Sequence, residues 1–340
     1  MFRMVKHLVF AGGGIRCLSF VGSLEILAKN NLLNDTKHFW GNSAGALVAT
    51  CLSLKAPLPK IRTIFETTDF TKFRDFDISN LMSFGSKWGL DTGASFVKQV
   101  KCILEDIKPG SSEYTLQELP DLHITATDLT DSKPVILDSK SYPNLKLIDA
   151  LRASTSIPFF YMPFKNPINN HLLIDGAVAC NFPWILLPES IDLNDAIGFN
   201  FASFDDLKEP STLPEYIHKV LNFRDTYWRQ KKYKPKHHNI INFDVRAFPS
   251  WHFAIDIKDR IELFNIGIDT TESWLISRSV KETVQTNQVS VPQNILGQEP
   301  QRDHINELLD NPVHSSLSKA PYFHQRLQKL SKLSYRRWSL

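Results

Sequence analysis

Three glycine-rich turns, each directly after a short apolar run, constrain the fold of this chain more than any other feature. They are Gly12-Gly13-Gly14 after residues 7–11, Gly41-Asn42-Ser43-Ala44-Gly45 after residues 37–40, and Asp175-Gly176-Ala177 after residues 172–174. Helical apolar patterns follow the first two turns, so the order strand, tight turn and helix occurs twice early in the chain. This repetition indicates an α/β fold, in which functional side chains gather at the carboxyl ends of the sheet strands.

Further apolar patterns predict the elements that would complete such a fold. Expected helices cover residues 59–67, 92–107 and 145–154, with two more from about Pro214 and around 257–268, and expected strands cover 122–127, 134–137, 196–201 and 240–243. The first two of these strands are spaced for a hairpin. Residues 70–91 show no regular apolar face, and they fit a mobile flap or an irregular packed loop equally well.

The composition excludes several functional classes. With 39 Lys and Arg against 36 Asp and Glu, the net charge of +3 does not indicate a nucleic-acid binder. No apolar run approaches the roughly 20 residues that cross a bilayer, and the N-terminus lacks the pattern of a signal peptide. The four cysteines are isolated and no metal-ligand spacing occurs, so we expect a reduced, intracellular and cytoplasmic protein without a metal site.

The second turn has the form GxSxG and makes Ser43 the candidate nucleophile. Between a strand and a helix, such a turn bends the backbone sharply and projects the serine hydroxyl from the edge of the sheet. Gly41 and Gly45 suit the bend because a Cβ atom would clash there. The helix that begins behind the turn also places the positive end of its dipole near Ser43.

The first turn supplies candidate oxyanion donors. Three successive glycines let backbone N–H groups point into one concave site, which suits a phosphate or an oxyanion. A P-loop would need Gly-Lys followed by Ser or Thr, which is missing, and the dinucleotide fingerprint fails at Cys17. Beside a nucleophilic serine, we therefore interpret Gly12, Gly13 and Gly14 as an oxyanion hole.

The base that activates Ser43 is expected to be Asp175 rather than a histidine. A GxSxG enzyme with a catalytic triad needs a histidine late in the chain. The late histidines do not follow convincing strands in glycine-marked turns; they are His218, His237, His238, His252, His304, His314 and His324. Asp175 does end a strand and precedes Gly176, so we expect its carboxylate at the same sheet edge as Ser43.

In this order and at these separations, AGGGIRC, GNSAG and DGA resemble the patatin-like phospholipase family. Residues 68–75, 153–158 and 253–275 match it further. The likeness covers about residues 5–278, which we expect to form the patatin-like domain. It leaves residues 279–340 as a polar and then basic C-terminal extension.

The resemblance implies a three-layer α/β/α sandwich with a central, mostly parallel sheet. It also implies a Ser-Asp dyad like that of cytosolic phospholipase A2, with Ser43 as nucleophile and Asp175 as general base. By the same likeness, the N–H groups of Gly13 and Gly14 bind the oxyanion, and Gly12 shapes the turn.

Two further positions of the first motif carry expectations from the family. Arg16 matches a family arginine, and it either steadies the glycine loop or meets a lipid phosphate. Cys17 departs from the usual glycine, which leaves the fine geometry of the loop open. Ala177 replaces a common glycine of the third motif and is a frequent family variant.

The implied function is hydrolysis of an acyl ester of a phospholipid or neutral lipid through an acyl-Ser43 intermediate, without a cofactor. Two alternatives stay open: an α/β-hydrolase esterase with a Ser-His-Asp triad, and a non-catalytic lipid-binding relative. Residues 319–340 carry six Lys or Arg, no acid and Trp338, which fits contact with an anionic membrane surface or a solvated tail. Because a lipase meets its substrate at an interface, we expect peripheral membrane association.

Overall fold

The computed structural model describes residues 4–75, 84–202, 239–250 and 252–288, together with positions 82, 209, 216 and 219. The chain divides into two compact units, Met1–Thr283 and Val284–Leu340. Apart from positions 216 and 219, the helix expected from about Pro214 lies outside the described residues, as does the basic segment 319–340. No helix in the described part of the chain is both long and apolar enough to cross a membrane.

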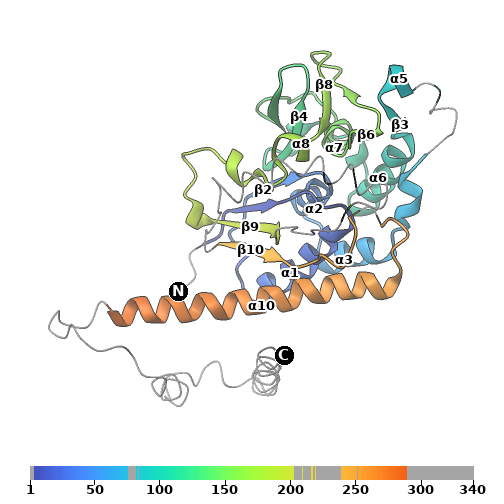
Figure 1. The fold of residues 1–340 in the computed structure, drawn as a ribbon. Coiled ribbons are helices and arrows are strands. Elements are labelled where there is room, and N and C mark those ends of the chain that lie inside the picture. The colour runs from blue at the N-terminus through green and yellow to red at the C-terminus, as the bar shows by residue number, and fades with distance from the viewer. Residues whose placement is uncertain are drawn as a thin grey trace. The chain divides into compact units, whose positions relative to one another are not determined.

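A central sheet of eight strands organises the first unit (Figure 1). Five of its strands pair in parallel in the order β10-β9-β1-β2-β4. Their bounds are β1 His7–Phe10, β2 His38–Asn42, β4 Leu122–Asp128, β9 Ala196–Phe201 and β10 Ile240–Phe243. Most of these side chains are buried, as expected for parallel strands that are covered on both faces.

The other three strands run antiparallel to their neighbours. They are β5 Lys133–Asp138, which pairs with β4 as the predicted hairpin, β8 Leu172–Asp175, which also pairs with β4, and β7 Phe164–Lys165, which pairs with β8. Strand β5 occupies one edge of β4, so β2 and β8 share the other edge. Asn42 at the end of β2 pairs with Thr125, and Asp175 at the end of β8 pairs with Ala126. The last residues of β2 and β8 therefore lie next to each other along the same edge of β4.

One face of the sheet is covered by two apolar helices, α1 Leu18–Lys29 and α2 Ala44–Ser53. The Phe20 ring of α1 lies 5.8 Å from the ring of Phe10 on β1 and 5.5 Å from that of Phe243 on β10, between ring centroids. Helices α3 Leu58–Thr67 and α10 Ile257–Gln288 pack outside α1 (Figure 1). Gly22 and Gly267 let α1 and α10 cross closely: a Cβ atom on Gly22 would lie 2.1 Å from the Phe264 carbonyl oxygen.

The opposite face is covered by α8 Ala177–Cys180 and the 3₁₀ turn η5 Pro183–Leu186. Phe182 and Trp184 pack over Gly198 of β9, where a Cβ atom would lie within 3 Å of both rings. Helices therefore flank the sheet on both faces, and the predicted three-layer α/β/α sandwich is confirmed.

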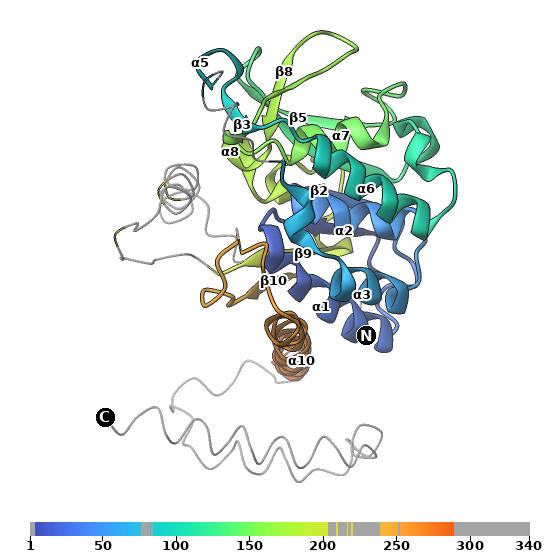
Figure 2. The same ribbon diagram turned by 90° about the vertical axis from the view of Figure 1, so that its right-hand side faces the viewer.

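The remaining short strands, helices and turns complete this frame. They are α5 Phe84–Lys87, α6 Ala94–Ile107, α7 Leu147–Ser154, the parallel pair β3 Gly89–Asp91 and β6 Phe159–Tyr161, and the 3₁₀ turns η1 Gly14–Cys17, η2 Phe70–Phe73, η3 Ser111–Glu113, η4 Leu116–Glu118 and η6 Leu193–Asp195. Helices α6 and α7 lie side by side next to α2 (Figure 2). Within 70–91, the described residues are packed around Phe73 and at 89–91, whereas Met82 and residues 85–88 are exposed. Phe73 is buried and its carbonyl accepts a hydrogen bond from the Tyr161 hydroxyl at 3.0 Å.

Candidate active site

Ser43 lies in a strained turn between β2 and α2. Its φ of 51° is in the left-handed region, which a residue with a side chain rarely adopts. The flanking glycines are required by close packing: a Cβ atom on Gly41 would lie 2.5 Å from Cα of Ala46, and one on Gly45 would lie 2.5 Å from the Ala11 carbonyl oxygen. The predicted sharp bend is therefore present at Ser43, whose side chain is largely buried.

The turn is held in place by Ser154, the last residue of α7. The Ser43 N–H donates a 2.8 Å hydrogen bond to Oγ of Ser154, which in turn donates to the carbonyl oxygen of Thr125 at 2.7 Å. Ser154 is completely buried. By accepting one hydrogen bond and donating another, the Ser154 hydroxyl links the backbone of the candidate nucleophile to strand β4.

Asp175 ends β8 and is only 3% exposed. Its N–H donates to the Ser156 carbonyl oxygen at 2.9 Å, and its own carbonyl oxygen accepts from the Thr127 hydroxyl at 2.9 Å. Its carboxylate oxygen Oδ1 accepts the Ala177 N–H at 2.8 Å. Both the backbone and the carboxylate are therefore fixed from several directions.

The structure brings Asp175 and Ser43 together, although the strands that end at them run in opposite directions. Strand β8 runs opposite to β4, so its carboxyl end points against the carboxyl ends of the parallel strands. The two residues meet because β2 and β8 end beside consecutive residues of β4. The side chains of Ser43 and Asn42 are the polar side chains near the Asp175 carboxylate that favour its charged form and lower its pKa.

Burial governs the acidity of Asp175. Loss of hydration disfavours the charged carboxylate and raises its pKa to about 6, while the hydrogen bond from Ala177 and the nearby side chains of Ser43 and Asn42 lower it. A pKa near 6 leaves the group ionised at neutral pH, and it makes the carboxylate a stronger base than an exposed aspartate.

The glycine loop lies directly against Ser43. A Cβ atom on Gly12 would lie 3.1 Å from Cβ of Ser43, and only glycine permits this approach. The Gly12 N–H donates to the Asn181 carbonyl oxygen at 3.1 Å, so it is engaged within the protein. The N–H groups of Gly13 and Gly14 have no acceptor among the described residues, and Gly14 has a left-handed φ of 56°. These two amides are the donors that remain for a ligand.

Arg16 and Cys17 both lie beneath this loop. The Arg16 side chain is buried, and its Nε donates a short hydrogen bond to the Phe248 carbonyl oxygen. The Cys17 thiol is fully buried, contacts the Ala11 carbonyl oxygen at 3.7 Å and has a pKa well above its usual range because burial disfavours the thiolate. The thiol thus fits the first turn of the helix, where it is not reactive.

Two asparagines complete the site and were missed from the sequence. Nδ2 of Asn42 donates to Oδ1 of Asn181 at 3.2 Å, and Nδ2 of Asn181 donates to the Gly12 carbonyl oxygen at 3.0 Å. The chain of contacts joins the end of β2 to the glycine loop. Asn42 lies within the GNSAG motif, so its position could have indicated a role in the site. Asn181 lies in no motif.

Of the late histidines, the structure describes only His252. His252 is exposed on the segment before α10, and His218, His237, His238, His304, His314 and His324 are not described. Within the described ranges, no histidine hydrogen bonds to Ser43.

Among the residues that the structure describes, one group of side chains has metal-ligand types. Donor atoms of Asp128, Asp131 and His171 lie within 4.8 Å of one another. Hydrogen bonds within the protein account for the arrangement: Asp128 accepts the N–H groups of Thr130 and Asp131 and contacts Nδ1 of His171 at 2.8 Å. The group closes the turn between β4 and β5, and we assign no metal to it.

The motifs of the candidate site lie within a match to a known protein family. The patatin-like phospholipase family model matches residues 8–187, which is more than half of the chain and includes the glycine loop, Ser43 and Asp175. "Uncharacterized protein R571" of Acanthamoeba polyphaga mimivirus is 24% identical over 284 residues, covering 80% of this chain and 94% of that protein. "Probable lipid hydrolase 463L" of Invertebrate iridescent virus 6 is 25% identical over 185 residues, covering 52% of this chain and 61% of that protein.

The fold has a counterpart among solved structures. VipD from Legionella pneumophila superposes with a TM-score of 0.56 at 16% sequence identity, covering 81% of this chain and 67% of that one. At this identity, the likeness concerns the fold alone.

Proposed function

This chain belongs to the patatin-like phospholipase family, and from that premise we propose that it hydrolyses carboxylic esters of lipids through an acyl-Ser43 intermediate. The observation that carries the proposal is the pairing of Ser43 with a buried carboxylate beside two glycine amides for which the described residues offer no acceptor. A nucleophile, a base and oxyanion donors are the groups that acyl transfer needs.

In the first half of the proposed reaction, Asp175 accepts the Ser43 proton as Oγ bonds to the ester carbonyl carbon. The carbonyl oxygen becomes an oxyanion, which the N–H groups of Gly13 and Gly14 stabilise; each donor of this kind contributes roughly 3 kcal/mol. When the C–O bond to the alcohol breaks, the proton held by Asp175 passes to the departing alkoxide. In the second half, water gives its proton to Asp175 and attacks the acyl-Ser43 ester, which releases the fatty acid and restores both side chains.

The chemistry of the base favours esters over amides. A carboxylic acid with a pKa of about 6 can protonate an alkoxide readily, whereas an amine leaving group needs stronger acid assistance. A lipid acyl hydrolase is therefore better supported than a protease. The substrate is a phospholipid or a neutral lipid, met at a membrane surface by peripheral association.

The proposal assigns supporting roles to the remaining motif residues. Arg16 steadies the glycine loop through its bond to Phe248, because a buried guanidinium engaged with the protein is poorly placed for a lipid phosphate. Gly41, Gly45 and Gly176 permit the close approach of β2, α2 and the Asp175 turn. A Cβ atom on Gly176 would lie 2.1 Å from Oδ1 of Asn42.

A fluorophosphonate probe tests the proposal on the full chain. The probe phosphonylates an activated serine, so we expect one adduct per chain on the tryptic peptide that contains Ser43, read by mass spectrometry. The unmodified protein should release free fatty acid from mixed phospholipid and triacylglycerol vesicles, and the adduct should not. An intact protein that neither labels at Ser43 nor releases fatty acid would favour a non-catalytic lipid binder.

Replacing Gly12 with alanine is expected to lower kcat about 100-fold with little change in KM, because small misplacements of reacting groups cost rates of that order. The methyl group would lie 2.7 Å from side-chain atoms of Asn42 and Asn181 and would push the loop away from Ser43. Steady-state hydrolysis of a soluble short-chain ester measures the effect. Gly85→Ala is the matched control, since no atom lies within 4 Å of its added methyl, and it should keep wild-type kinetics. Equal kinetics in the two variants would contradict the tight packing of the loop on Ser43.

A further inference from the structure

One short segment at the C-terminal end of α7 contacts both Ser43 and Asp175. Oγ of Ser154 accepts the Ser43 N–H at 2.8 Å. Two residues later, the carbonyl oxygen of Ser156 accepts the Asp175 N–H at 2.9 Å. Both serines are completely buried. Because the same few residues hold the backbones of the candidate nucleophile and the candidate base, a shift of this segment would change the distance between the two.

Arg152 fixes the end of the segment that holds Asp175. Its Nη1 donates a short hydrogen bond to Oγ of Ser156. The Ser156 hydroxyl donates in turn to the Arg152 carbonyl oxygen at 2.7 Å. Ser156 is therefore held by both the side chain and the backbone of one arginine, and the peptide group that binds Asp175 cannot rotate independently of it.

The guanidinium of Arg152 is itself anchored outside α7. Its Nη2 donates to the carbonyl oxygens of Thr92 and Met162 at 3.0 and 2.9 Å. Gly93 makes room for it: this glycine has a left-handed φ of 78°, and a Cβ atom on it would lie 1.9 Å from Nε of Arg152. The arginine thus ties the end of α7 to the segments that follow β3 and β6.

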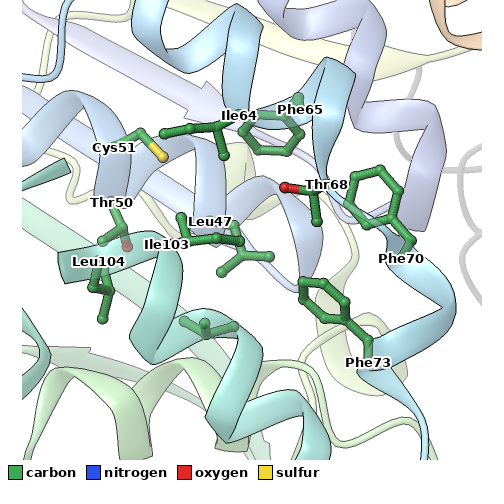
Figure 3. A pocket seen from close by; sticks show the side chains of 11 residues that line it. Leu47, Thr50, Cys51, Ile64, Phe65, Thr68, Phe70, Phe73, Ile103 and Leu104 are labelled. Carbon is green, nitrogen blue, oxygen red and sulfur yellow. The ribbon is translucent and has the colours of Figure 1, made fainter. Parts of the chain in front are cut away.

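Tyr161 extends this anchor into the apolar interior. The Arg152 guanidinium lies 5.0 Å from the centroid of the Tyr161 ring, which is 3% exposed. The Tyr161 hydroxyl donates to the Phe73 carbonyl oxygen, and the Phe73 ring packs with apolar side chains of α2, α3 and α6 around a small pocket (Figure 3). The position of Arg152 is therefore set by the packed interior rather than by a surface loop.

The charge of Arg152 is compensated where it lies. Arg152 is only 4% exposed, and burial lowers the pKa of its guanidinium, whereas Tyr161, Asp91 and Asp75 favour the charged form. Asp91 is completely buried, and its carboxylate accepts the N–H groups of Asp75 and Gly93, each at 2.7 Å. A buried cation is stable only with bound donors and nearby negative charge. Both conditions are met, so Arg152 is a rigid anchor rather than a mobile cation.

We propose that Arg152 is a positioning residue for the Ser43–Asp175 pair. The inference rests on the proposed function and adds to it how the geometry of the pair is maintained. Arg152 holds Ser156, and Ser156 holds the backbone of Asp175 at a fixed distance from Ser154, which holds Ser43. A misplacement of about 1 Å between reacting groups costs roughly 100-fold in rate, so loosening this segment should slow the chemical step without weakening substrate binding.

Ser156→Ala tests the proposal on the full chain with the smallest change. It removes the hydroxyl that Arg152 holds and keeps the carbonyl oxygen that binds Asp175. We expect kcat for a soluble short-chain ester to fall about tenfold with KM unchanged. A looser Asp175 gains hydration, which lowers its pKa, so the acid inflection of kcat/KM should move below the value of about 6 expected for wild type.

Substitutions of Arg152 test the anchor directly. Arg152→Met removes all of its donors and should lower kcat about 100-fold. Arg152→Lys keeps a cation that can still bind a carbonyl oxygen, although it lacks the planar fork, so it should recover about tenfold of that loss. Ser156→Ala decides the question even if an Arg152 variant does not fold.

Thr155→Val is the matched control in the same segment. Thr155 is buried, but its hydroxyl donates to the carbonyl oxygens of Leu151 and Arg152, both within α7, at 2.9 and 3.3 Å. This variant should keep the wild-type kcat and pH profile. If Ser156→Ala and Arg152→Lys lower the melting temperature yet keep wild-type kcat and the wild-type inflection, the positioning role is overturned while the hydrolase stands. If the wild type itself hydrolyses no ester, the proposed function fails first, which distinguishes the two failures.

Discussion

Ser43→Ala is expected to lower kcat for any ester substrate by roughly 10⁴-fold or more, which is the scale seen when a catalytic serine is removed. The methyl group cannot attack a carbonyl carbon, and only substrate positioning and the glycine amides remain to promote reaction with water. Release of fatty acid from lipid vesicles, followed by mass spectrometry, measures the loss. The variant should still bind vesicles as the wild type does, because no acyl intermediate is needed for that step.

Ser53→Ala provides the matched control on the same helix. Ser53 is also buried, but it bonds to Asp121 at the far end of α2, about 15 Å along the helix axis from Ser43. Its loss should reduce stability slightly and leave kcat unchanged. Full activity in Ser43→Ala, or equal losses in both variants, would exclude Ser43 as the nucleophile.

Asp175→Asn is expected to reduce kcat roughly 10⁴-fold, since an amide of the same shape cannot accept the Ser43 proton. The amide side chain keeps an acceptor oxygen for the Ala177 N–H, so the fold should be retained. Wild-type kcat/KM should fall tenfold per pH unit below about pH 6 and level off above it, because only the ionised carboxylate acts as base. A pH profile without an inflection near 6, or a fully active Asp175→Asn variant, would contradict this role.

The dependence of protein stability on pH tests the burial of the Asp175 carboxylate independently of catalysis. Burial raises its pKa in the folded protein above the value of about 4 in an unfolded chain. Its contribution is therefore most favourable below pH 4 and is lost as the pH rises through about 6. The melting temperature of Asp175→Asn relative to that of wild type should be higher at pH 8 than at pH 4, measured by circular dichroism. A difference in melting temperature that does not vary with pH would mean that the carboxylate is not perturbed by burial.

Much of the fold could be predicted from local sequence patterns. The helices and strands predicted around the first two glycine turns are present, as are the β4–β5 hairpin and the helices α3, α6 and α7, with ends displaced by at most two residues. These elements have regular apolar periodicity and clear end signals, which depend only on neighbouring residues. Phe73 lies in a range without that periodicity, and it is held by a distant partner, the Tyr161 hydroxyl.

The candidate site could be predicted from the sequence only in part. The residue types in GNSAG and in the glycine loop indicated a nucleophile and backbone donors, because sharp turns and close approaches require glycine. Ser154 appeared only within a family match, and Asn181 appeared in none. Both act through hydrogen bonds to residues more than 100 positions away, a separation over which local patterns carry no information.

The sequence by itself determined the two strand–turn–helix units and the strain at Ser43, since glycine placement and apolar spacing act within a few residues of the chain. Only the tertiary structure decided how Asp175 reaches Ser43. Strand β8 runs antiparallel to β4, so strand direction alone does not predict that its last residue lies at the site. The pairing register on β4 places that residue beside the end of β2. Register depends on hydrogen bonds between strands far apart in the chain, and burial of the carboxylate, which raises its pKa, follows from that same packing.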